Sequence, residues 1–515
     1  MRIAIANKFP QRIYVIIRSF NTNICSRQVK QKMNIRDLIL NGKEHSIIYN
    51  GKITSSNEIL CKAMKICNFI KHHHNISSER IGIYIQNSTE YLIAYFAISL
   101  TGENIIVPFY SIMTATELFH EVKNSDVNLI LTNTSAYISL CEKCKHIPHF
   151  ITVLNIDTLT CVSFNQLYFE QTFNNLPILP EYNDATILLQ TSGSTSNPKK
   201  VIHTSASIIK NAQIHINGID LKQGERTSVH IPMSFSYCNS AIIIASFILG
   251  NSIFIDDKPF NPKHFLEDMD TWEITNTILV PTQLQMLNRY LQTPYGFHSL
   301  RKLCYGGSFL PLKTLESISF NLKNTKLINT YGQTEAGPRI STNYNGSPGS
   351  IGTPIDGIHI KIVDECGNEV PNGKQGNIIV QSPCLMLGYH KNPQLTSQTI
   401  VNGWLHTGDV GYYDEKDYYI TGRKKNIIIC GGINIYPEEI EEVLLEIPGI
   451  NMAQVYPMHH DVLGEIPFAK VELEDDSIFD ENRIREYCSK KLSKHKVPYR
   501  VFQGEINHTK TGKVL

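Results

Sequence analysis

The sequence predicts an α/β fold built on mainly parallel sheets, and three observations support this prediction. Strand-like and helix-like hydrophobic patterns alternate over residues 34–133, and the alternation resumes over residues 207–326. Such alternation favours parallel strands with helices covering both faces of the sheet. A turn-rich stretch near residue 350, followed by strands with hairpin signals, predicts a smaller β-rich part after the parallel sheets.

The individual elements follow from hydrophobic spacing and turn residues. Residues 57–71 and 90–101 predict amphipathic helices, because their apolar side chains recur at helical spacing, and residues 241–249 predict an apolar helix. Pro437 suits the first turn of a further helix, with Glu438 and Glu439 favourable near its N-terminus. Short apolar runs predict strands at residues 80–86, 104–108, 127–132, 185–189, 359–363, 376–380 and 426–430.

The composition is that of an ordinary globular protein. The 515 residues are 42% hydrophobic with a formal net charge of +1, which argues against nucleic acid as the main partner. No run of about 18 apolar residues is present, so we expect no transmembrane segment. The twelve scattered cysteines favour free thiols in a reducing compartment, and hence a cytoplasmic protein.

Residues 1–32 differ from the rest of the chain, because they carry seven basic residues and no acidic one. This bias imitates an organellar transit peptide, which makes organellar import one alternative. The favoured interpretation is a basic extension that is not part of the fold.

A polar loop follows the predicted strand at residues 185–189. Hydroxyls, main-chain N–H groups and a lysine suit phosphate, and a glycine lets the backbone approach it closely. A solvated Ser/Thr-rich turn is an equally good interpretation of these residues alone. The residues concerned are Thr191, Ser192, Gly193, Ser194, Thr195 and Lys199.

Further motifs follow this loop in the chain. They are Gly306-Gly307, Tyr331-Gly332-Gln333-Thr334-Glu335, Thr407-Gly408-Asp409, Arg423-Lys424-Lys425, Gly431-Gly432 and Thr511-Gly512-Lys513. Taken with the Thr191 loop, this series resembles the adenylate-forming superfamily of acyl-CoA synthetases, peptide-synthetase adenylation domains and luciferases. It is most similar to acyl-CoA synthetases, and the resemblance covers residues 34–515. Ser196 and Lys200 depart from the family pattern, which has glycine at both positions.

The resemblance implies a role for each motif. Lys513 would bridge the carboxylate and the α-phosphate, Thr334 would donate to the α-phosphate, and Glu335 would hold Mg²⁺. Lys199 and the Thr191 loop would bind the phosphates of ATP. Tyr331 would stack on the purine, Asp409 would bind the ribose, and Arg423 would contact the ribose and phosphates. Small residues would leave room for the nucleotide and the acyl group, namely Gly306, Gly307 and Gly332. Gly431 and Gly432 would line the tunnel for the pantetheine arm.

The segment Phe235-Ser236-Tyr237 falls where the family binds its carboxylate substrate. Domains that activate α-amino acids place an aspartate where this chain has Ser236. A neutral hydroxyl cannot offset a buried ammonium group, so an amino acid is disfavoured and a fatty or aryl acid is expected.

The resemblance therefore implies an AMP-forming acid–thiol ligase that uses ATP, Mg²⁺ and coenzyme A. A carrier-protein phosphopantetheine is the alternative acceptor, and an amino-acid-activating domain is an alternative activity. A nucleotide-binding pseudoenzyme is the alternative of another class, prompted by Ser196, Lys200 and the short segment after Lys513.

The resemblance also implies the domain organisation. Residues 33–422 would form the large domain, with a β-subdomain at about residues 345–422. Residues 423–515 would form a small, mobile α+β domain that rotates about Lys425.

Overall fold

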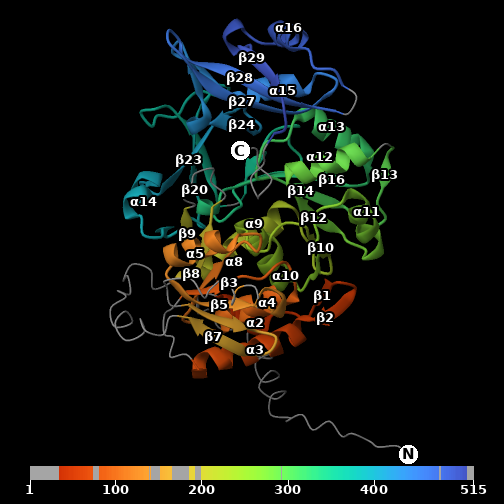
Figure 1. Ribbon diagram of the computed structural model, residues 1–515, viewed down its shortest axis with the longest axis vertical. Coiled ribbons are helices and arrows are strands. Elements are labelled where there is room, and N and C mark those ends of the chain that lie inside the picture. The colour runs from red at the N-terminus through yellow and green to blue at the C-terminus, as the bar shows by residue number, and fades with distance from the viewer. Residues whose placement is uncertain are drawn as a thin grey trace, which may run out of the picture. The chain divides into compact units, whose positions relative to one another are not determined.

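The computed structural model describes residues 34–73, 80–137, 140, 151–164, 185–191, 199–291, 293–355, 357–474 and 477–506 (Figure 1). Contacts divide the chain into residues 1–33 and residues 34–515. The basic extension expected at residues 1–32 lies outside the described residues. Among the helices that are described, none has both the length and the apolar character that crossing a membrane requires.

The first large sheet has a parallel centre and antiparallel edges. Its strand order is β21-β9-β8-β4-β3-β5-β6-β7, and the five strands from β8 to β6 run parallel. The outer strands β7, β9 and β21 are antiparallel to their neighbours. The bounds are β3 Arg80–Ile83, β4 Ile105–Pro108, β5 Val127–Thr132, β6 Ile151–Asn155, β7 Thr160–Phe164, β8 Ala185–Gln190, β9 Lys200–Thr204 and β21 Gly388–Tyr389.

The second large sheet has the order β18-β17-β16-β14-β12-β10-β11-β1-β2, and it is parallel from β16 to β1. The predicted parallel architecture is therefore confirmed for the centre of both sheets. The bounds are β1 Ser46–Tyr49, β2 Lys52–Ser55, β10 Arg226–Val229, β11 Ser252–Ile255, β12 Asn276–Leu279, β14 Lys302–Tyr305, β16 Lys326–Tyr331, β17 Ser341–Asn343 and β18 Thr353–Pro354; β13 Tyr295–Gly296 and β15 Leu322–Lys323 pair separately.

The largest apolar cluster draws residues from both sheets and from the helices between them. Helix α4 (Thr89–Thr101) begins at the N-cap Ser88 and ends at Gly102, and every residue from Tyr91 to Thr101 is buried. The predicted amphipathic character of this helix is therefore wrong: packing on several sides leaves it no polar face. The other helices of this part are α2 Ile35–Asn41, α3 Ser56–His73, α5 Ala115–Asn124, α8 Ser205–Gly218, α11 Pro262–Thr271, α12 Pro281–Tyr290 and α13 Leu312–Asn321.

The apolar helix expected at residues 241–249 begins earlier and is irregular. It comprises α9 (Ser236–Cys238), a π-helical segment (Asn239–Ile244) and α10 (Ala245–Leu249). Such π-helical turns often occur at functional sites.

An antiparallel sheet of order β19-β20-β23-β22, with β24 also paired to β23, follows the parallel sheets. The predicted β-rich part is confirmed. Its elements are β19 His359–Val363, β20 Gly376–Gln381, α14 Pro393–Thr399, β22 Ile400–Val401, β23 Trp404–Tyr413 and β24 Tyr418–Arg423.

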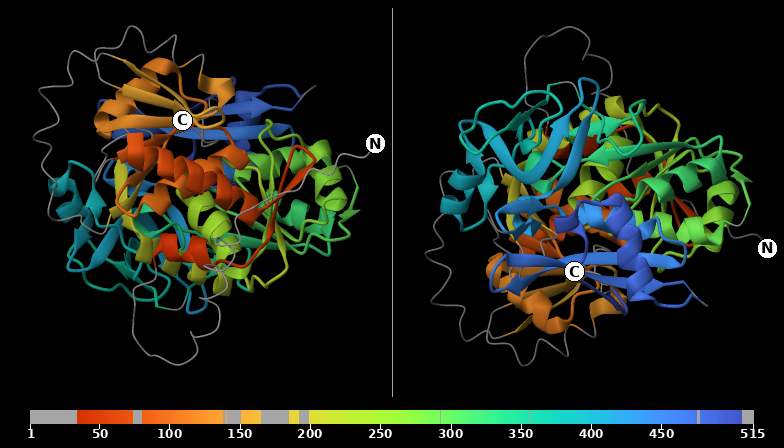
Figure 2. Two further views of the ribbon diagram at one scale, coloured as in Figure 1. Left: turned by 90° about the horizontal axis from the view of Figure 1, so that it is seen from below. Right: turned by 90° about the horizontal axis from the view of Figure 1, so that it is seen from above.

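The C-terminal elements form a smaller α+β domain with its own apolar cluster, which contains only residues between Ile428 and Val501. Its sheet has the order β26-β25-β28-β27, with β29 paired to β28, and Figure 2 shows these elements in blue as one group. They are β25 Ile428–Cys430, β26 Ile433–Ile435, α15 Pro437–Leu445, β27 Ile450–His460, β28 Gly464–Leu473, α16 Glu481–Lys491 and β29 Arg500–Gln503.

Candidate active site

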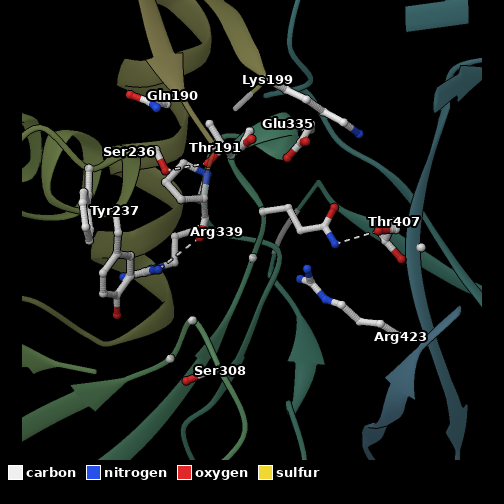
Figure 3. Close-up of a pocket in the computed structure, with 18 of the residues that line it drawn as sticks. Gln190, Thr191, Lys199, Ser236, Tyr237, Ser308, Glu335, Arg339, Thr407 and Arg423 are labelled. Atoms are coloured by element: carbon white, nitrogen blue, oxygen red, sulfur yellow. Dashed lines mark hydrogen bonds between the residues drawn. The ribbon is translucent and has the colours of Figure 1, made fainter. Parts of the chain in front are cut away.

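A cavity of about 600 Å³ opens where several strands of the large domain end (Figure 3). Thr191 follows β8, Gly306 follows β14 and Gly332 follows β16, so the carboxyl ends of strands from both large sheets reach it. Ligands in parallel sheets bind at such strand ends.

Most of the residues predicted from the sequence line this cavity. They are Thr191, Lys199, Phe235, Ser236, Tyr237, Gly306, Gly307, Gly332, Thr334, Glu335, Arg423 and Lys425. Ser192, Gly193, Ser194, Thr195 and Lys513 lie outside the described residues.

Four predicted residues lie elsewhere. Gly431 and Gly432 are exposed in the turn between β25 and β26, and both have positive φ. Tyr331 packs in an apolar cluster, and Asp409 is only 2% exposed. Neither Tyr331 nor Asp409 is among the residues that line the cavity.

Close packing of the backbone explains why glycine occupies two of the positions at the cavity. A Cβ atom at Gly306 would lie 2.2 Å from the carbonyl oxygen of Thr330, and one at Gly332 would lie 2.0 Å from that of Pro338. These two glycines are therefore required by close backbone packing. Gly307, at φ +96°, has nothing within 4 Å of its missing Cβ and faces open space.

Asp409 is the centre of a hydrogen-bond network that joins β16, β23 and β24. Its Oδ2 accepts from the Tyr331 hydroxyl at 2.6 Å and from Gln333 Nε2 at 2.8 Å, and Arg423 Nε lies 3.0 Å from Oδ1. Burial and the neighbouring Asp409 charge raise the pKa of Tyr331 well above its usual value, so this phenol stays a donor. The network holds Arg423 at the cavity wall.

Glu335 and Tyr389 form a second polar pair. The Tyr389 hydroxyl donates to Glu335 Oε1 at 2.7 Å, and Lys199 Nζ lies 5.1 Å from the centre of the Tyr389 ring. No motif in the sequence indicates Tyr389, which lies on the edge strand β21, far from Glu335 in the chain.

Positive charge gathers at this side of the cavity. Lys199, Arg423 and Lys425 all line it. Burial lowers the pKa of Lys425, and the positive charges of Arg423 and Lys199 lower it further. Because like charges repel, an anion bound among these three side chains would be favoured.

Thr334 is held at the other side of the cavity by hydrogen bonds to Ser236 and His203, which local sequence patterns do not indicate. Its hydroxyl lies 3.0 Å from Ser236 Oγ, and its carbonyl oxygen lies 2.6 Å from His203 Nε2. Burial lowers the pKa of His203 to about 4, so the imidazole is neutral at pH 7 and donates from Nε2. Nearby, the Tyr237 hydroxyl bonds Thr330 Oγ1 at 2.7 Å, and the Phe235 ring meets Tyr110 edge to face.

Lys200, the departure from the family glycine, turns away from the cavity. Its ammonium forms a buried ion pair with Glu121 at 2.8 Å and donates to the Glu121 carbonyl and to Ser125. Lys200 therefore anchors β9 to α5.

Comparison with known proteins gives two family matches. The model of AMP-binding enzymes matches residues 40–390, and the model of the AMP-binding enzyme C-terminal domain matches residues 439–513. A long-chain-fatty-acid–CoA ligase of Bacillus subtilis is 28% identical, over 91% of this chain and 90% of the relative. A putative acyl–CoA ligase of the same organism is 32% identical over 67% and 70%, and a 2-succinylbenzoate–CoA ligase of Bacillus licheniformis is 27% identical over 86% and 89%.

Solved structures share the fold. ATP-bound MatB from Rhodopseudomonas palustris matches with a TM-score of 0.81 and 22% identity, over 94% of this chain and 97% of that chain. The o-succinylbenzoate coenzyme A synthetase of Bacillus subtilis, in complex with ATP and magnesium ion, matches with a TM-score of 0.79 and 24% identity, over 93% and 97%. The sequence matches over most of its length establish that the chain belongs to the AMP-binding enzyme family.

Proposed function

We propose that the protein activates a carboxylic acid with ATP to an acyl-adenylate and then transfers the acyl group to coenzyme A. The observation that carries this proposal is the cluster of Lys199, Arg423 and Lys425 in the same cavity as the carboxylate of Glu335 and the hydroxyl of Thr334. The three cationic side chains suit a polyphosphate, and the Glu335 carboxylate in the same cavity suits a divalent metal ion. The relatives named as fatty-acid, 4-coumarate and 2-succinylbenzoate CoA ligases support the same reaction.

In the first step, a carboxylate oxygen of the acid attacks the α-phosphorus of ATP. The bond from the α-phosphorus to the bridging oxygen breaks, and pyrophosphate leaves with the electron pair. Thr334 would donate to the α-phosphate, while Lys199, Thr191 and the rest of its loop would hold the β- and γ-phosphates. Arg423 would contact the ribose and phosphates, with Tyr331 and Asp409 behind it.

Mg²⁺ fits this site, because the Glu335 carboxylate lines the cavity and carboxylate oxygens are ligands that Mg²⁺ prefers. When bound, the ion would offset the negative charge of the triphosphate. Tyr389 would orient the carboxylate through its hydrogen bond to Oε1.

In the second step, the thiol of coenzyme A attacks the acyl carbon. The bond between that carbon and the phosphate oxygen breaks, AMP leaves with the electron pair, and the thiol loses its proton to solvent. We assign Lys513 to the first step and Gly431 and Gly432 to the pantetheine path of the second. The domain of residues 423–515 would turn about Lys425 between the two steps, relative to residues 33–422.

The acid is proposed to be a fatty or aryl acid. Phe235, Tyr237 and Tyr110 give the cavity aromatic walls, and Ser236 is neutral where an ammonium group would need a carboxylate. We place the activity in the cytoplasm, which the free thiols of the described cysteines support.

The test is ATP–pyrophosphate exchange with a panel of acids, followed by addition of coenzyme A. We expect exchange that depends on a carboxylic acid and on Mg²⁺, and acyl-CoA formation when coenzyme A is present. Exchange without acyl-CoA would assign the acceptor to a carrier protein, and exchange with amino acids only would overturn the substrate class. Nucleotide binding without any exchange would identify a pseudoenzyme.

A further inference from the structure

Arg339 is a buried cation at the cavity that the proposed reaction leaves unused. It is 1% exposed, the largest side chain so completely buried among the described residues, and it also lines the cavity. It lies four residues beyond Glu335, just after the η4 turn Thr334–Ala336.

The described partners of the Arg339 guanidinium are neutral. Nε donates to His215 Nδ1 at 2.9 Å, Nη1 donates to the carbonyl of Pro338 at 3.1 Å, and the Tyr237 ring lies 3.7 Å from Cζ. Burial lowers the pKa of His215 well below its usual value, and the Arg339 charge lowers it further, so this ring is an uncharged acceptor. None of the ion pairs among the described residues includes Arg339.

One end of the guanidinium has no partner at all in the described part of the protein, because Nη2 is buried and makes no hydrogen bond. An arginine keeps its charge inside a protein, and a buried charge without a counter-ion is strongly unfavourable. An unpaired buried N–H adds to that cost. A bound anion would relieve both.

The position of Arg339 indicates which part of the ligand that anion belongs to. In Figure 3, Arg339 lies beside Tyr237, whereas Lys199, Thr407 and Arg423 lie across the cavity from it. The triphosphate is assigned to the Lys199 side. Thr334, assigned to the α-phosphate, hydrogen-bonds Ser236, so the reacting carboxylate would lie near this pair. The Arg339 guanidinium packs instead on the Tyr237 ring, and we assign it to a more distant part of the acid.

We propose that Arg339 is a specificity-determining residue that binds a second carboxylate on the acid substrate, so that the protein prefers dicarboxylic acids to acids with an apolar end. This inference rests on the proposed function. Because Nη2 is buried, a carboxylate reaches it only when side chains packed around the guanidinium, such as the Tyr237 ring, shift on binding. The planar guanidinium then donates from Nη2 while Nε and Nη1 keep their present acceptors. An acid that ends in a methyl group would leave the charge uncompensated, which is the basis for its rejection.

The experiment compares straight-chain acids of four to ten carbons as matched pairs, one carboxylate against two at equal carbon number, by ATP–pyrophosphate exchange. For the unaltered protein we expect kcat/KM to be at least about tenfold higher for the diacid in the best pair. A preference for the monoacid in every pair would overturn the inference and leave the proposed function standing. No exchange with any acid would instead overturn the proposed function.

Variants then assign the preference to Arg339. Arg339→Leu should lower kcat/KM for the diacid about 100-fold, mainly through KM, and leave or improve that for the monoacid. Arg339→Lys should keep part of the preference for the diacid, because lysine keeps the positive charge but lacks the planar set of N–H donors of the guanidinium.

Arg226→Leu is the matched control, since Arg226 is a partly buried arginine that bonds the Trp272 carbonyl and Glu273 away from the cavity. The Arg226→Leu variant should keep the preference for the diacid. An equal loss for both acids in Arg339→Leu, with ATP binding by calorimetry intact, would show that Arg339 is only structural. If Arg339→Leu does not fold, the preference of the unaltered protein decides.

Discussion

The carboxylate of Asp126 contacts basic side chains from two distant parts of the chain. Arg80 Nη1 lies 3.6 Å from Asp126 Oδ2, and His390 Nε2 lies 3.3 Å from the same oxygen. Lys391 Nζ bonds Oδ1. Burial alone would raise the pKa of Asp126, but hydrogen bonds from His390 and Lys391 and the charges of Lys391 and Arg80 outweigh it and lower the pKa to about 2. The residue thus links the start of β5 to the end of β21.

Asp126→Asn tests this link through its pH dependence. The folded pKa lies below the ordinary value of 3.8, so the stabilisation is complete above about pH 4 and is lost as the pH falls towards 2. We expect the variant to melt several degrees lower at pH 7, with the difference shrinking between pH 4 and pH 2 in thermal scans. Asp461→Asn, at a side chain that is 99% exposed, should show no such change. A difference for Asp126→Asn that is equal at every pH would contradict the assignment.

Tyr389 is expected to act on the metal through Glu335. Glu335→Ala should reduce exchange by about 100-fold, because the proposed Mg²⁺ ligand is lost. Tyr389→Phe removes only the hydrogen bond to Oε1 and should raise the Mg²⁺ concentration for half-maximal exchange about tenfold. Tyr49→Phe, which removes a tyrosine–carboxylate bond to Asp257 outside the cavity, is the control. An unchanged Mg²⁺ dependence in Tyr389→Phe would remove Tyr389 from the site.

At the scale of elements, β9 and α5 are joined by one buried ion pair. Burial lowers the pKa of Lys200 and its Glu121 partner opposes that shift, so each charge depends on the other. Removing both charges from water costs free energy, so the pair as a whole stabilises the fold little. Removing one partner destabilises the fold strongly, because the other charge is then buried and unpaired. The lysine in place of a family glycine is therefore explained by packing between two elements.

A double-mutant cycle measures this dependence. Lys200→Met should destabilise the protein by about 3–5 kcal/mol, because it leaves a buried carboxylate unpaired. Adding Glu121→Leu should recover much of that loss, as determined from urea unfolding of the two single variants and the double variant. Strictly additive losses would mean that the two side chains do not act as a pair.

At the scale of the whole molecule, the smaller C-terminal domain has a separate apolar cluster, and Arg423 and Lys425 reach the cavity from the segment that leads into it. A separate core lets a domain move as one body about a short segment. This supports the proposed alternation between two half-reactions.

Lys513→Ala tests that alternation. It should abolish formation of the acyl-adenylate yet leave transfer from supplied acyl-adenylate to coenzyme A nearly unchanged, because the lysine is assigned to the first step only. The two half-reactions are measured separately, with Lys490→Ala, at an exposed lysine of α16, as the control. Equal loss of both half-reactions would contradict the division of roles.

The order of the motifs and the alternation of strands and helices could be predicted from the sequence, because both depend on local spacing. Hydrophobic period gave the parallel centres of both large sheets, and residues such as Thr334, Glu335 and Arg423 were found by their neighbours in the chain. Buried helix α4 was misjudged as amphipathic, since its spacing could not reveal that elements pack on several sides of it.

The sequence by itself determined the fold class and the kind of chemistry, through residues that lie close together in short motifs. Only the tertiary structure decided what surrounds each charge: Asp409 beside Tyr331, Tyr389 on Glu335, Lys200 on Glu121, and Arg339 on His215. In the order given, the two members of these pairs are 78, 54, 79 and 124 residues apart in the chain. Local patterns carry no information about such distant contacts, because burial and electrostatics depend on which elements the folded chain brings together.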